Sequence, residues 1–406
     1  YMEISKKMMD FILLHANDDV NTLRLKYSGK NAGILDFNLD LALIQIEARK
    51  KARKKIPSYI GKGQFLFPSL IAEEQASNEA VARFHASLVP SSSSILDLTA
   101  GLGIDDFEFA KAGMSVTTCE IDTLKSEVLQ HNANVLDLAD NITVKNCNSI
   151  DYIQTYSGKT DVIFADPARR DASGGKVHAL ADCQPDILTI MPGIMKISPR
   201  LIVKASPLLD ISLICKTVEN LKRIYVVSFR GECKEVLMDI NPGHDFEGIT
   251  VVDLDWNAEI SRFNFHPHEN QDESQITYFS GKQPTEYQYL YEPNAGIMKV
   301  ADWKSLGETF KNLRKCDPNT HLFLSDTLYD DFPGRIHKIY GMPGKRELKA
   351  LKGSRYNIVA RNYPLSAPQV AKKYSIVSGG TDYLYAFRCG GNPVIIISQP
   401  IMRDQQ

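Results

Sequence analysis

Between residues 94 and 229, short apolar runs alternate with stretches of helical periodicity. The apolar runs, which have the length and composition of strands, are residues 95–98, 115–120, 142–145, 161–165, 201–205 and 225–229. The helical patterns between them are residues 104–112, 123–138 and 212–221. Strands that alternate with helices form βαβ units, in which a parallel sheet is buried between helices. The alternation therefore predicts an α/β fold with a Rossmann-like, doubly wound and mostly parallel sheet.

The regions on either side of this alternation have a different character. Residues 1–90 contain mostly helical patterns, and after residue 275 short strands and helices follow one another. Residues 236–240 and 249–254 are predicted to form an antiparallel hairpin at the sheet edge, and the polar residues 265–274 to form a linker. We therefore expect four parts: an N-terminal helical region (1–90), a Rossmann-like core (91–264), a small α+β module (275–332) and a basic domain (333–406).

Charge is distributed unevenly along the chain, although the formal net charge is only −2, from 47 basic and 49 acidic residues. Residues 240–299 contain ten acidic and three basic residues, whereas residues 333–375 contain ten basic residues and one acidic residue. Six of the seven residues 49–55 are also basic. Such asymmetry is typical of domains with different partners, although a basic stretch can also be a solvated helix face.

The composition argues against several classes of protein. The apolar runs are far shorter than the roughly 20 residues that a membrane-spanning helix needs, so no membrane partner is expected. The 7 cysteines are scattered without a CxxC pair, which argues against a zinc site and a disulfide framework. The first residues have mixed charge and lack the small-residue cleavage site of a signal peptide. We therefore expect a cytoplasmic protein without a bound metal.

The most specific motif is DLTAGLGID at residues 97–105, where a hydrophobic strand runs into a glycine-rich turn that opens a helix. Gly101 and Gly103 permit backbone angles and a close ligand approach that a Cβ atom would block. The fingerprint of NAD-binding proteins needs a third glycine where this chain has Asp106, which disfavours a dinucleotide. A strand–turn–helix without any ligand remains the alternative.

Polar residues follow three further strands of the predicted sheet. Glu120 ends the second strand, 17 residues after Gly103, where a carboxylate can accept hydrogen bonds from both hydroxyl groups of a ribose. Asn148 and Asp151 follow the third strand, where an adenine edge would lie, and Asp166 follows the fourth. Each of them alone could be a surface acid or part of a turn. Their order places them all at the carboxyl ends of parallel strands, where open α/β sheets bind ligands.

These residues resemble the motifs of the class I S-adenosylmethionine-dependent methyltransferases. DLTAGLGID is similar to the first motif of that family, CEID (119–122) to the second and ADPAR (165–169) to the fourth. The segment 74–86 is similar to one that closes over the cofactor in several amino-group methyltransferases. The resemblance implies S-adenosylmethionine as cofactor, bound by Ser77, Glu79, Asp97, Thr99, Gly101, Gly103, Asp105, Glu120, Asn148 and Asp151.

The resemblance extends to enzymes that act on RNA. Residues 74–170 are similar to trimethylguanosine-synthase-like and other RNA methyltransferases, and the chain beyond residue 275 resembles a bacterial group with a ferredoxin-like module and a THUMP-like C-terminal domain. The family implies RNA as substrate and a base nitrogen as methyl acceptor. Enzymes that methylate exocyclic amines usually carry an aromatic residue after the fourth-motif prolines, to stack on the base. Here Asp166 and Pro167 are followed by Ala168 and Arg169, which leaves the acceptor atom open.

Methyl transfer from a sulfonium is an in-line displacement in which the protein mainly aligns the reacting atoms. Asp166, held by the rigid turn at Pro167, is the candidate to orient the acceptor or to take its proton. Arg169 or Arg170 is a candidate to hold a phosphate or stack on a base. A salt bridge from these arginines to Asp171 is the alternative.

The basic stretch within residues 333–375 suggests what the substrate is. Its basic residues recur at near-helical spacing and are interleaved with tyrosines. Such a surface suits phosphate contacts and stacking on unpaired bases. The basic residues include Lys345, Arg346, Lys349, Lys352 and Arg355, and the tyrosines are Tyr340, Tyr356 and Tyr363. The stretch could instead dock on the acidic residues 240–299. Two functions therefore remain: an RNA methyltransferase, or a protein of another class, either a methyltransferase for a protein or small molecule or a catalytically silent cofactor-binding protein.

Overall fold

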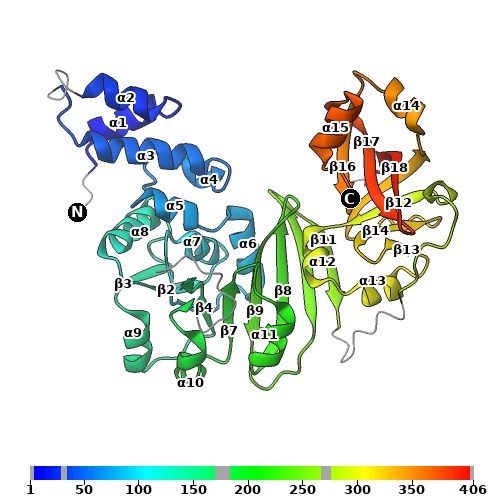
Figure 1. Ribbon diagram of the computed structural model, residues 1–406. Helices are drawn as coiled ribbons and strands as arrows, with labels where there is room; N and C mark the ends of the chain where they lie inside the picture. The colour runs from blue at the N-terminus through cyan, green and yellow to red at the C-terminus, as the bar shows by residue number, and fades with distance from the viewer. Residues whose placement is uncertain (1–3, 29–33, 170–182, 267–275, 403–406) are drawn as a thin grey trace. The chain divides into compact units, whose positions relative to one another are not determined.

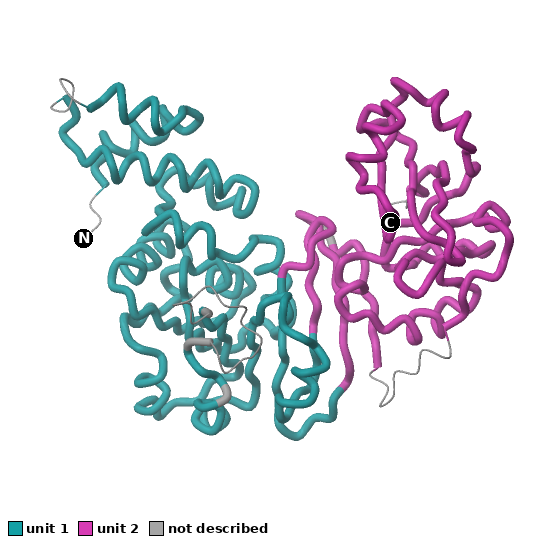
Figure 2. Tube along the Cα trace, viewed as in Figure 1, with its two compact units in different colours: residues 1–224, 235–246 teal, residues 225–234, 247–406 magenta. Residues whose placement is uncertain are grey.

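The computed structural model describes residues 4–28, 34–169, 183–266 and 276–402. They divide into two compact units (Figure 2), the first comprising residues 1–224 and 235–246 and the second residues 225–234 and 247–406. In the described part of the chain, no helix is both long and apolar enough to cross a membrane.

Unit 1 begins with helices, as predicted for residues 1–90. They are α1 (Lys6–Leu14), α2 (Val20–Tyr27), α3 (Leu39–Ala52), α4 (Pro57–Ile60), α5 (Leu70–Gln75) and α6 (Glu79–Ser87). Side chains of Met8, Ile12, Leu23 and Ile46 form the core of α1, α2 and α3. The first turn of α6 is capped by Asn78, whose side chain accepts hydrogen bonds from the backbone N–H groups of Ala80 and Val81, as its short polar side chain allows.

The basic residues 49–55 are largely used within the fold. Arg49 is only 3% exposed and donates hydrogen bonds to the backbone carbonyls of Phe65 (2.7 Å) and Ile60 (3.0 Å). Lys55 donates to the backbone carbonyl of Glu73 at 3.0 Å, and Lys51 forms a salt bridge with the side chain of Glu74. This cluster therefore ties α3 to the segments that follow it and is not one continuous solvated face.

The central sheet of unit 1 is mostly parallel, which confirms the predicted fold class (Figure 1). It belongs to a nine-stranded sheet whose order is β3-β2-β1-β4-β7-β9-β8-β10-β11. The first six strands of this order are β1 (Ser94–Asp97), β2 (Ser115–Glu120), β3 (Ile142–Asn146), β4 (Val162–Ala165), β7 (Leu201–Ala205) and β9 (Glu232–Ile240), and β8 (Leu221–Phe229), β10 (Ile249–Asp255) and β11 (Ala258–Phe265) complete it. In the order from β3 to β9, only the pairing of β7 with β9 is antiparallel. The connecting helices are α7 (Ile104–Lys111), α8 (Thr123–Val135), α9 (Ser149–Thr155), α10 (Ile187–Ile197) and α11 (Ile211–Thr217). From β1 the chain builds β2 and β3 on one side of that strand, and then crosses to add β4 on its other side. A ligand crevice is expected at such a reversal of strand order, beside the carboxyl ends of β1 and β4.

The predicted hairpin of residues 236–240 with 249–254 is wrong. Those residues lie in β9 and β10 (Ile249–Asp255), and β8 (Leu221–Phe229) stands between the two in the strand order. The true hairpin joins β8 to β9 through the two residues Arg230 and Gly231, which both have positive φ. The two-residue turn that β-hairpins favour requires positive φ at both of its central residues. Residues 236–240 are all buried, which explains why they lie inside a sheet and not at its edge.

Unit 2 contains the antiparallel pair of β10 and β11 (Ala258–Phe265) and a separate seven-stranded sheet. The order of that sheet is β13-β14-β12-β15-β18-β17-β16, with β12 (Tyr289–Pro293), β13 (Arg314–Asp317), β14 (Thr320–Ser325), β15 (Gly334–Gly341), β16 (Arg355–Arg361), β17 (Val377–Cys389) and β18 (Asn392–Pro400). The helices are α12 (Ala295–Val300), α13 (Trp303–Thr309), α14 (Lys345–Ala350) and α15 (Ala367–Tyr374). The domain boundary expected at residue 333 lies directly before β15. Because β15 pairs with β12, which precedes that boundary, the residues on its two sides share one sheet. Most of the expected linker, residues 267–274, lies outside the described residues.

Candidate active site

The glycine-rich turn after β1 has the backbone conformation that its glycines allow. Gly101 and Gly103 have φ values of +59° and +81°, in the left-handed region that glycine adopts without steric cost. A Cβ atom at Gly103 would lie 3.0 Å from Leu129 and 3.2 Å from Phe107. At Gly101 the nearest atom of the described residues would be 3.8 Å away. Gly103 is therefore needed for the packing of α7 and α8, whereas Gly101 leaves space beside the turn.

Hydrogen bonds join this turn to the ends of two neighbouring strands. Asp97 accepts from the backbone N–H of Thr99 at 2.7 Å, and the hydroxyl oxygen of Thr99 accepts from the backbone N–H of Asp166 at 2.6 Å. Glu120, at the end of β2, accepts from the backbone N–H of Gly101 at 3.2 Å. The first, second and fourth motifs of the sequence therefore meet at one end of the sheet.

A buried carboxylic acid stands where a dinucleotide-binding turn would have its third glycine. Asp106 is completely buried, and burial, reinforced by neighbouring Asp97, raises its pKa well above the ordinary value. Burial likewise raises the pKa of Asp97 to about 7. The pair is therefore expected to retain a proton near neutral pH.

Lys204, on β7, links three of the predicted site residues, although the sequence did not single it out. Its ammonium donates to Asp166 Oδ2 at 2.7 Å and to Ser77 Oγ at 2.8 Å, and it lies 3.5 Å from Asp105 Oδ2. Ser77 Oγ in turn donates to the same oxygen of Asp105 at 2.5 Å. Residues from the loop before α6, the first turn of α7 and the end of β4 thus converge on one ammonium group.

His85, on α6, extends this network into the interior. Its ring is fully buried, with Nδ1 2.7 Å from Asp105 Oδ1 and Nε2 2.5 Å from Glu235 Oε1 on β9. Burial lowers the pKa of His85, but attraction to Glu235 and Asp105 outweighs it and raises the pKa to about 9. Burial acts to raise the pKa of Asp105, yet Lys204 and His85 hold it well below its usual range. Three carboxylates face two cations, so the network carries one net negative charge.

The raised pKa of His85 predicts a pH-dependent stability. The folded state holds the proton more tightly than the unfolded chain, so the stabilisation is complete below about pH 6.5 and is lost as pH rises through about 9. At 1.36 kcal/mol per pKa unit, its upper bound is about 3 kcal/mol. We expect urea denaturation to show this loss between pH 6 and 9.5. His85→Gln should abolish that pH-dependent component, and an equal loss in both proteins would contradict the assignment.

The remaining predicted site residues lie apart from this network. Asn148 is exposed and caps α9 by accepting from the backbone N–H of Ile150, and Asp151 is exposed in the first turn of that helix. Glu79 accepts from the backbone N–H of Ser58 and from Arg83. In the described ranges, no hydrogen bond or ion pair joins these three side chains to the site residues above.

The end of the fourth motif is described only in part. Pro167 is buried. The backbone of Arg169 lies in β5 (Ala168–Arg169), which pairs with β6 (Cys183–Gln184). The expected roles of Arg170 and Asp171, including their salt bridge, lie outside the described residues.

Lys204, His85 and Glu235 are the polar groups that sequence reasoning missed. The signal for Lys204 was present, because a lysine within the otherwise apolar strand LIVKA must have a buried partner. His85 and Glu235 carry no comparable signal, because each lies in an ordinary amphipathic pattern and their proximity depends on the packing of α6 against β9.

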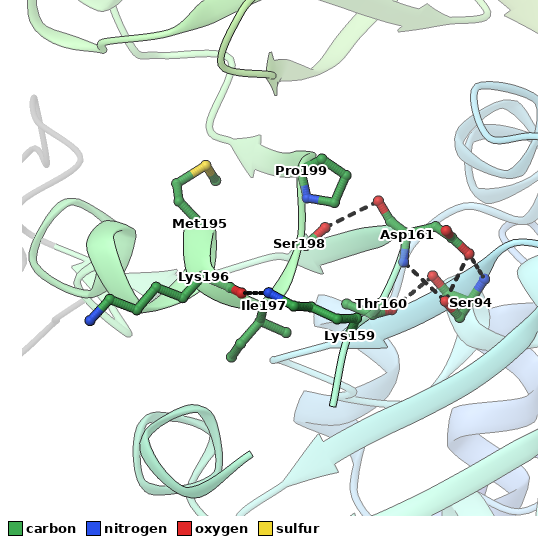
Figure 3. A pocket seen from close by; sticks show the side chains of 9 residues that line it. All are labelled: Ser94, Lys159, Thr160, Asp161, Met195, Lys196, Ile197, Ser198 and Pro199. Atoms are coloured by element: carbon green, nitrogen blue, oxygen red, sulfur yellow. Dashed lines mark hydrogen bonds between the residues drawn. The ribbon is translucent and has the colours of Figure 1, made fainter. Parts of the chain in front are cut away.

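A surface cavity of about 430 Å³ lies at the opposite ends of the same strands (Figure 3). Its lining includes Ser94, which begins β1, and Asp161, which precedes β4. Its polar groups already bond to one another: Asp161 accepts from the backbone N–H of Ser94 at 2.7 Å, and Lys159 donates to the backbone carbonyl of Lys196. The cavity is therefore separate from the network around Lys204.

The groups at the crevice suit S-adenosylmethionine. The open left-handed turn at Gly101 permits close approach of a ligand, and the carboxylate of Glu120 can accept from ribose hydroxyls. Among the described residues, no cluster of histidine, cysteine or carboxylate side chains could hold a metal ion.

Three family models match separate stretches of the chain. Residues 92–176 match the RNA cap guanine-N2 methyltransferases, residues 289–333 a ferredoxin-like domain and residues 335–400 a THUMP-like domain. Among curated protein sequences, none is significantly similar to this chain.

Solved structures agree with the fold. A protein from Porphyromonas gingivalis W83, provisionally described as a methyltransferase, superposes with a TM-score of 0.80 at 24% identity, covering 99% of this chain and 100% of its own. TrmK of M. capricolum, solved with S-adenosylhomocysteine, has a TM-score of 0.32 at 12% identity over 44% of this chain and 71% of its own. The first of these likenesses shows a shared fold, and the second is too partial to support an argument. The match of residues 92–176, together with the shared fold, supports an S-adenosylmethionine-dependent methyltransferase activity.

Proposed function

We propose that this enzyme methylates RNA in the cytoplasm, with a base nitrogen as the acceptor. The observation that carries the proposal is the charge of the THUMP-like domain: all ten basic side chains of residues 333–375 are exposed. A chain with a net charge of −2 has no general need for such a surface, whereas an RNA backbone does. The match to RNA cap guanine-N2 methyltransferases supports a base nitrogen as acceptor.

The site can supply what this reaction requires. S-adenosylmethionine, when bound, provides a methyl group already activated for displacement. Gly101, Gly103 and Glu120 are proposed to bind the cofactor, with Asp97 and Thr99 shaping the turn around it. Asp166 would accept a hydrogen bond from the N–H of the acceptor and then take its proton, which orients the nitrogen lone pair. Pro167 restricts the backbone at this point, and Arg169 is proposed to contact a phosphate or a base.

Docking of the basic residues on the acidic segment 240–299 is the competing explanation. Glu292 does pair with Arg361 at 2.7 Å, and its other oxygen lies 3.7 Å from Arg335. By contrast, Lys345, Arg346 and Lys349 of α14 are exposed, and no salt bridge joins them to an acidic residue in the described part of the chain. The surface of α14 is therefore the part available to RNA.

Reversing the charges of α14 tests the proposal. In Lys345→Glu/Arg346→Glu/Lys349→Glu, RNA affinity at 100 mM salt should fall at least ~10-fold. The slope of log K against log salt should become less steep by about 2, because roughly 0.7 counterions are released per phosphate contact with a single strand. Both quantities are measured by fluorescence titration with labelled cellular RNA.

A control variant separates a local effect from one of total charge. Lys6→Glu/Lys216→Glu/Lys311→Glu changes the net charge equally at exposed positions on other elements and should retain wild-type RNA affinity. If instead the α14 variant lost thermal stability and kept its RNA affinity, the docking explanation would be correct. RNA binding by the wild type that does not respond to salt would remove the RNA proposal.

One observation favours a different substrate class. No aromatic residue follows Asp166 and Pro167, where base-methylating enzymes place a stacking ring. A methyltransferase for a protein or small molecule would not need that ring. Methyl label that enters protein, or that survives RNase treatment of the reaction, would favour this alternative.

A further inference from the structure

Lys204 occupies an unusual position for a lysine, on a central strand of a buried parallel sheet. Its neighbours on β7, Ile202 and Val203, are at most 1% exposed, and Lys204 itself is 7% exposed. Removing an ammonium group from water costs several kcal/mol unless ionic and hydrogen-bonding partners compensate. A residue kept at such a cost needs an explanation, and its contacts supply one.

The contact with Asp166 fixes the direction of a carboxylate that is otherwise open to solvent. The side chain of Asp166 is 43% exposed, whereas that of Lys204 is 8% exposed. Lys204 Nζ holds the Oδ2 oxygen at 2.7 Å, and the backbone N–H of Asp166 is bound to Thr99. Asp166 is thus held at both its backbone and its side chain. Among the described residues, no hydrogen bond or ion pair occupies Oδ1, which is therefore available to an acceptor.

Lys204 is itself held in place from three sides. Ser77 accepts its hydrogen bond at 2.8 Å, Asp105 Oδ2 lies at 3.5 Å and Glu235 Oε2 at 3.9 Å. The His85 ring lies between the carboxylates of Asp105 and Glu235 and forms a hydrogen bond with each of them. The ammonium therefore connects Asp166 to the segment at Ser77, which the sequence suggests closes over the cofactor.

We propose that Lys204 is a positioning residue for methyl transfer, whose ammonium aims the Asp166 carboxylate at the acceptor nitrogen. This inference rests on the proposed function. In the step, the acceptor nitrogen forms a bond to the methyl carbon while the carbon–sulfur bond breaks, and sulfur keeps that electron pair. The proton of the nitrogen passes to Asp166 Oδ1, and Lys204 keeps its own protons.

The electrostatics of the network agree with this division of roles. Burial lowers the pKa of Lys204, but Asp105, Asp166 and Glu235 outweigh it and raise the pKa well above the ordinary value. Lys204 therefore stays charged and cannot act as the base. The excess negative charge of the network offsets the ammonium, so positive charge that develops on the acceptor nitrogen is not opposed.

Two variants test the proposal by methyl transfer into total cellular RNA. Lys204→Met should lower kcat about 100-fold, a loss typical of misplacing a reacting group by about 1 Å, with Kd for S-adenosylmethionine within ~3-fold of wild type. Lys204→Arg, which keeps the charge, should recover at least a tenth of kcat, a rescue that a merely structural role would not require.

Combination with Asp166→Asn separates positioning from a merely structural role. If Lys204 acts through Asp166, the double variant should be no more than ~3-fold slower than Asp166→Asn alone. Additive losses would overturn the inference. Lys315→Met, at another buried lysine in unit 2, is the control for removing a buried ammonium and should leave kcat unchanged.

Two further results separate the outcomes. Lys204→Met/Glu235→Gln removes one cation and one carboxylate, so the network keeps its wild-type net charge even if Lys204→Met alone unfolds. If this double variant is folded but slow, it supports the role of Lys204. If it is folded and as fast as wild type, the inference is wrong. A wild-type enzyme that leaves RNA unlabelled overturns the proposed function and this inference with it. Labelled RNA together with an unimpaired, folded Lys204→Met overturns the inference alone.

Discussion

Replacing Asp166 by alanine is expected to lower turnover about 100-fold or more, the typical loss for a group that handles a proton in the transition state. Cofactor affinity should stay nearly unchanged, because the turn at Gly101 and the carboxylate of Glu120 do not depend on the Asp166 side chain. Single-turnover rates and calorimetry with S-adenosylhomocysteine measure the two effects.

The exposed Asp140, in the loop before β3, supplies the matched control. Asp140→Ala removes the same chemical group outside the site and should have wild-type turnover. If Asp166→Ala turns over at the wild-type rate on its substrate, the proposed role of Asp166 is wrong.

Gly101→Val should abolish most affinity for S-adenosylmethionine. A β-branched residue at a φ of +59° is strained by ~1–3 kcal/mol, and its side chain would occupy the open side of the turn. Because the valine side chain blocks the side of the turn that the cofactor is proposed to approach, a loss of at least 10-fold in Kd, which corresponds to about 1.4 kcal/mol, is expected in calorimetry.

Gly113 controls for backbone strain alone. It has a φ of +89°, and no atom of the described residues lies within 4 Å of its Cβ position, but it lies in the turn between α7 and β2, away from the crevice. Gly101→Ala and Gly113→Ala should therefore lose similar stability, and only Gly101→Ala should lose affinity. Equal affinity in the two variants, or tighter binding of NAD than of S-adenosylmethionine by the wild type, would contradict the assignment of the turn.

The strands of the parallel sheet were predictable because a strand buried on both faces is a short, nearly continuous apolar run. β2 and β7 coincide with the predicted residues 115–120 and 201–205, and the other strands differ by a few residues at their ends. The positions of Gly101, Glu120 and Asp166 followed from the same pattern, because parallel strands end on one side of a sheet. Periodicity was thus sufficient for the core and for the edge that carries the candidate site.

Pairing between distant segments was not predictable in the same way. Residues 236–240 and 249–254 have the same apolar pattern whichever strand lies beside them, and only the positive φ at Arg230 and Gly231 marks the true hairpin. The network around Lys204 is also a long-range feature. It joins residues 77, 85, 105, 166, 204 and 235, whose spacing in the sequence has no period.

The central claim is that this methyltransferase acts on RNA, and transfer of a labelled methyl group tests it most directly. The full chain would be incubated with methyl-labelled S-adenosylmethionine and total cellular RNA, with Asp166→Ala as the slow control. We predict label in the RNA fraction that RNase releases completely, and that the Asp166→Ala enzyme introduces about 100-fold more slowly. Label that resists RNase, or that appears equally with Asp166→Ala, would contradict the account.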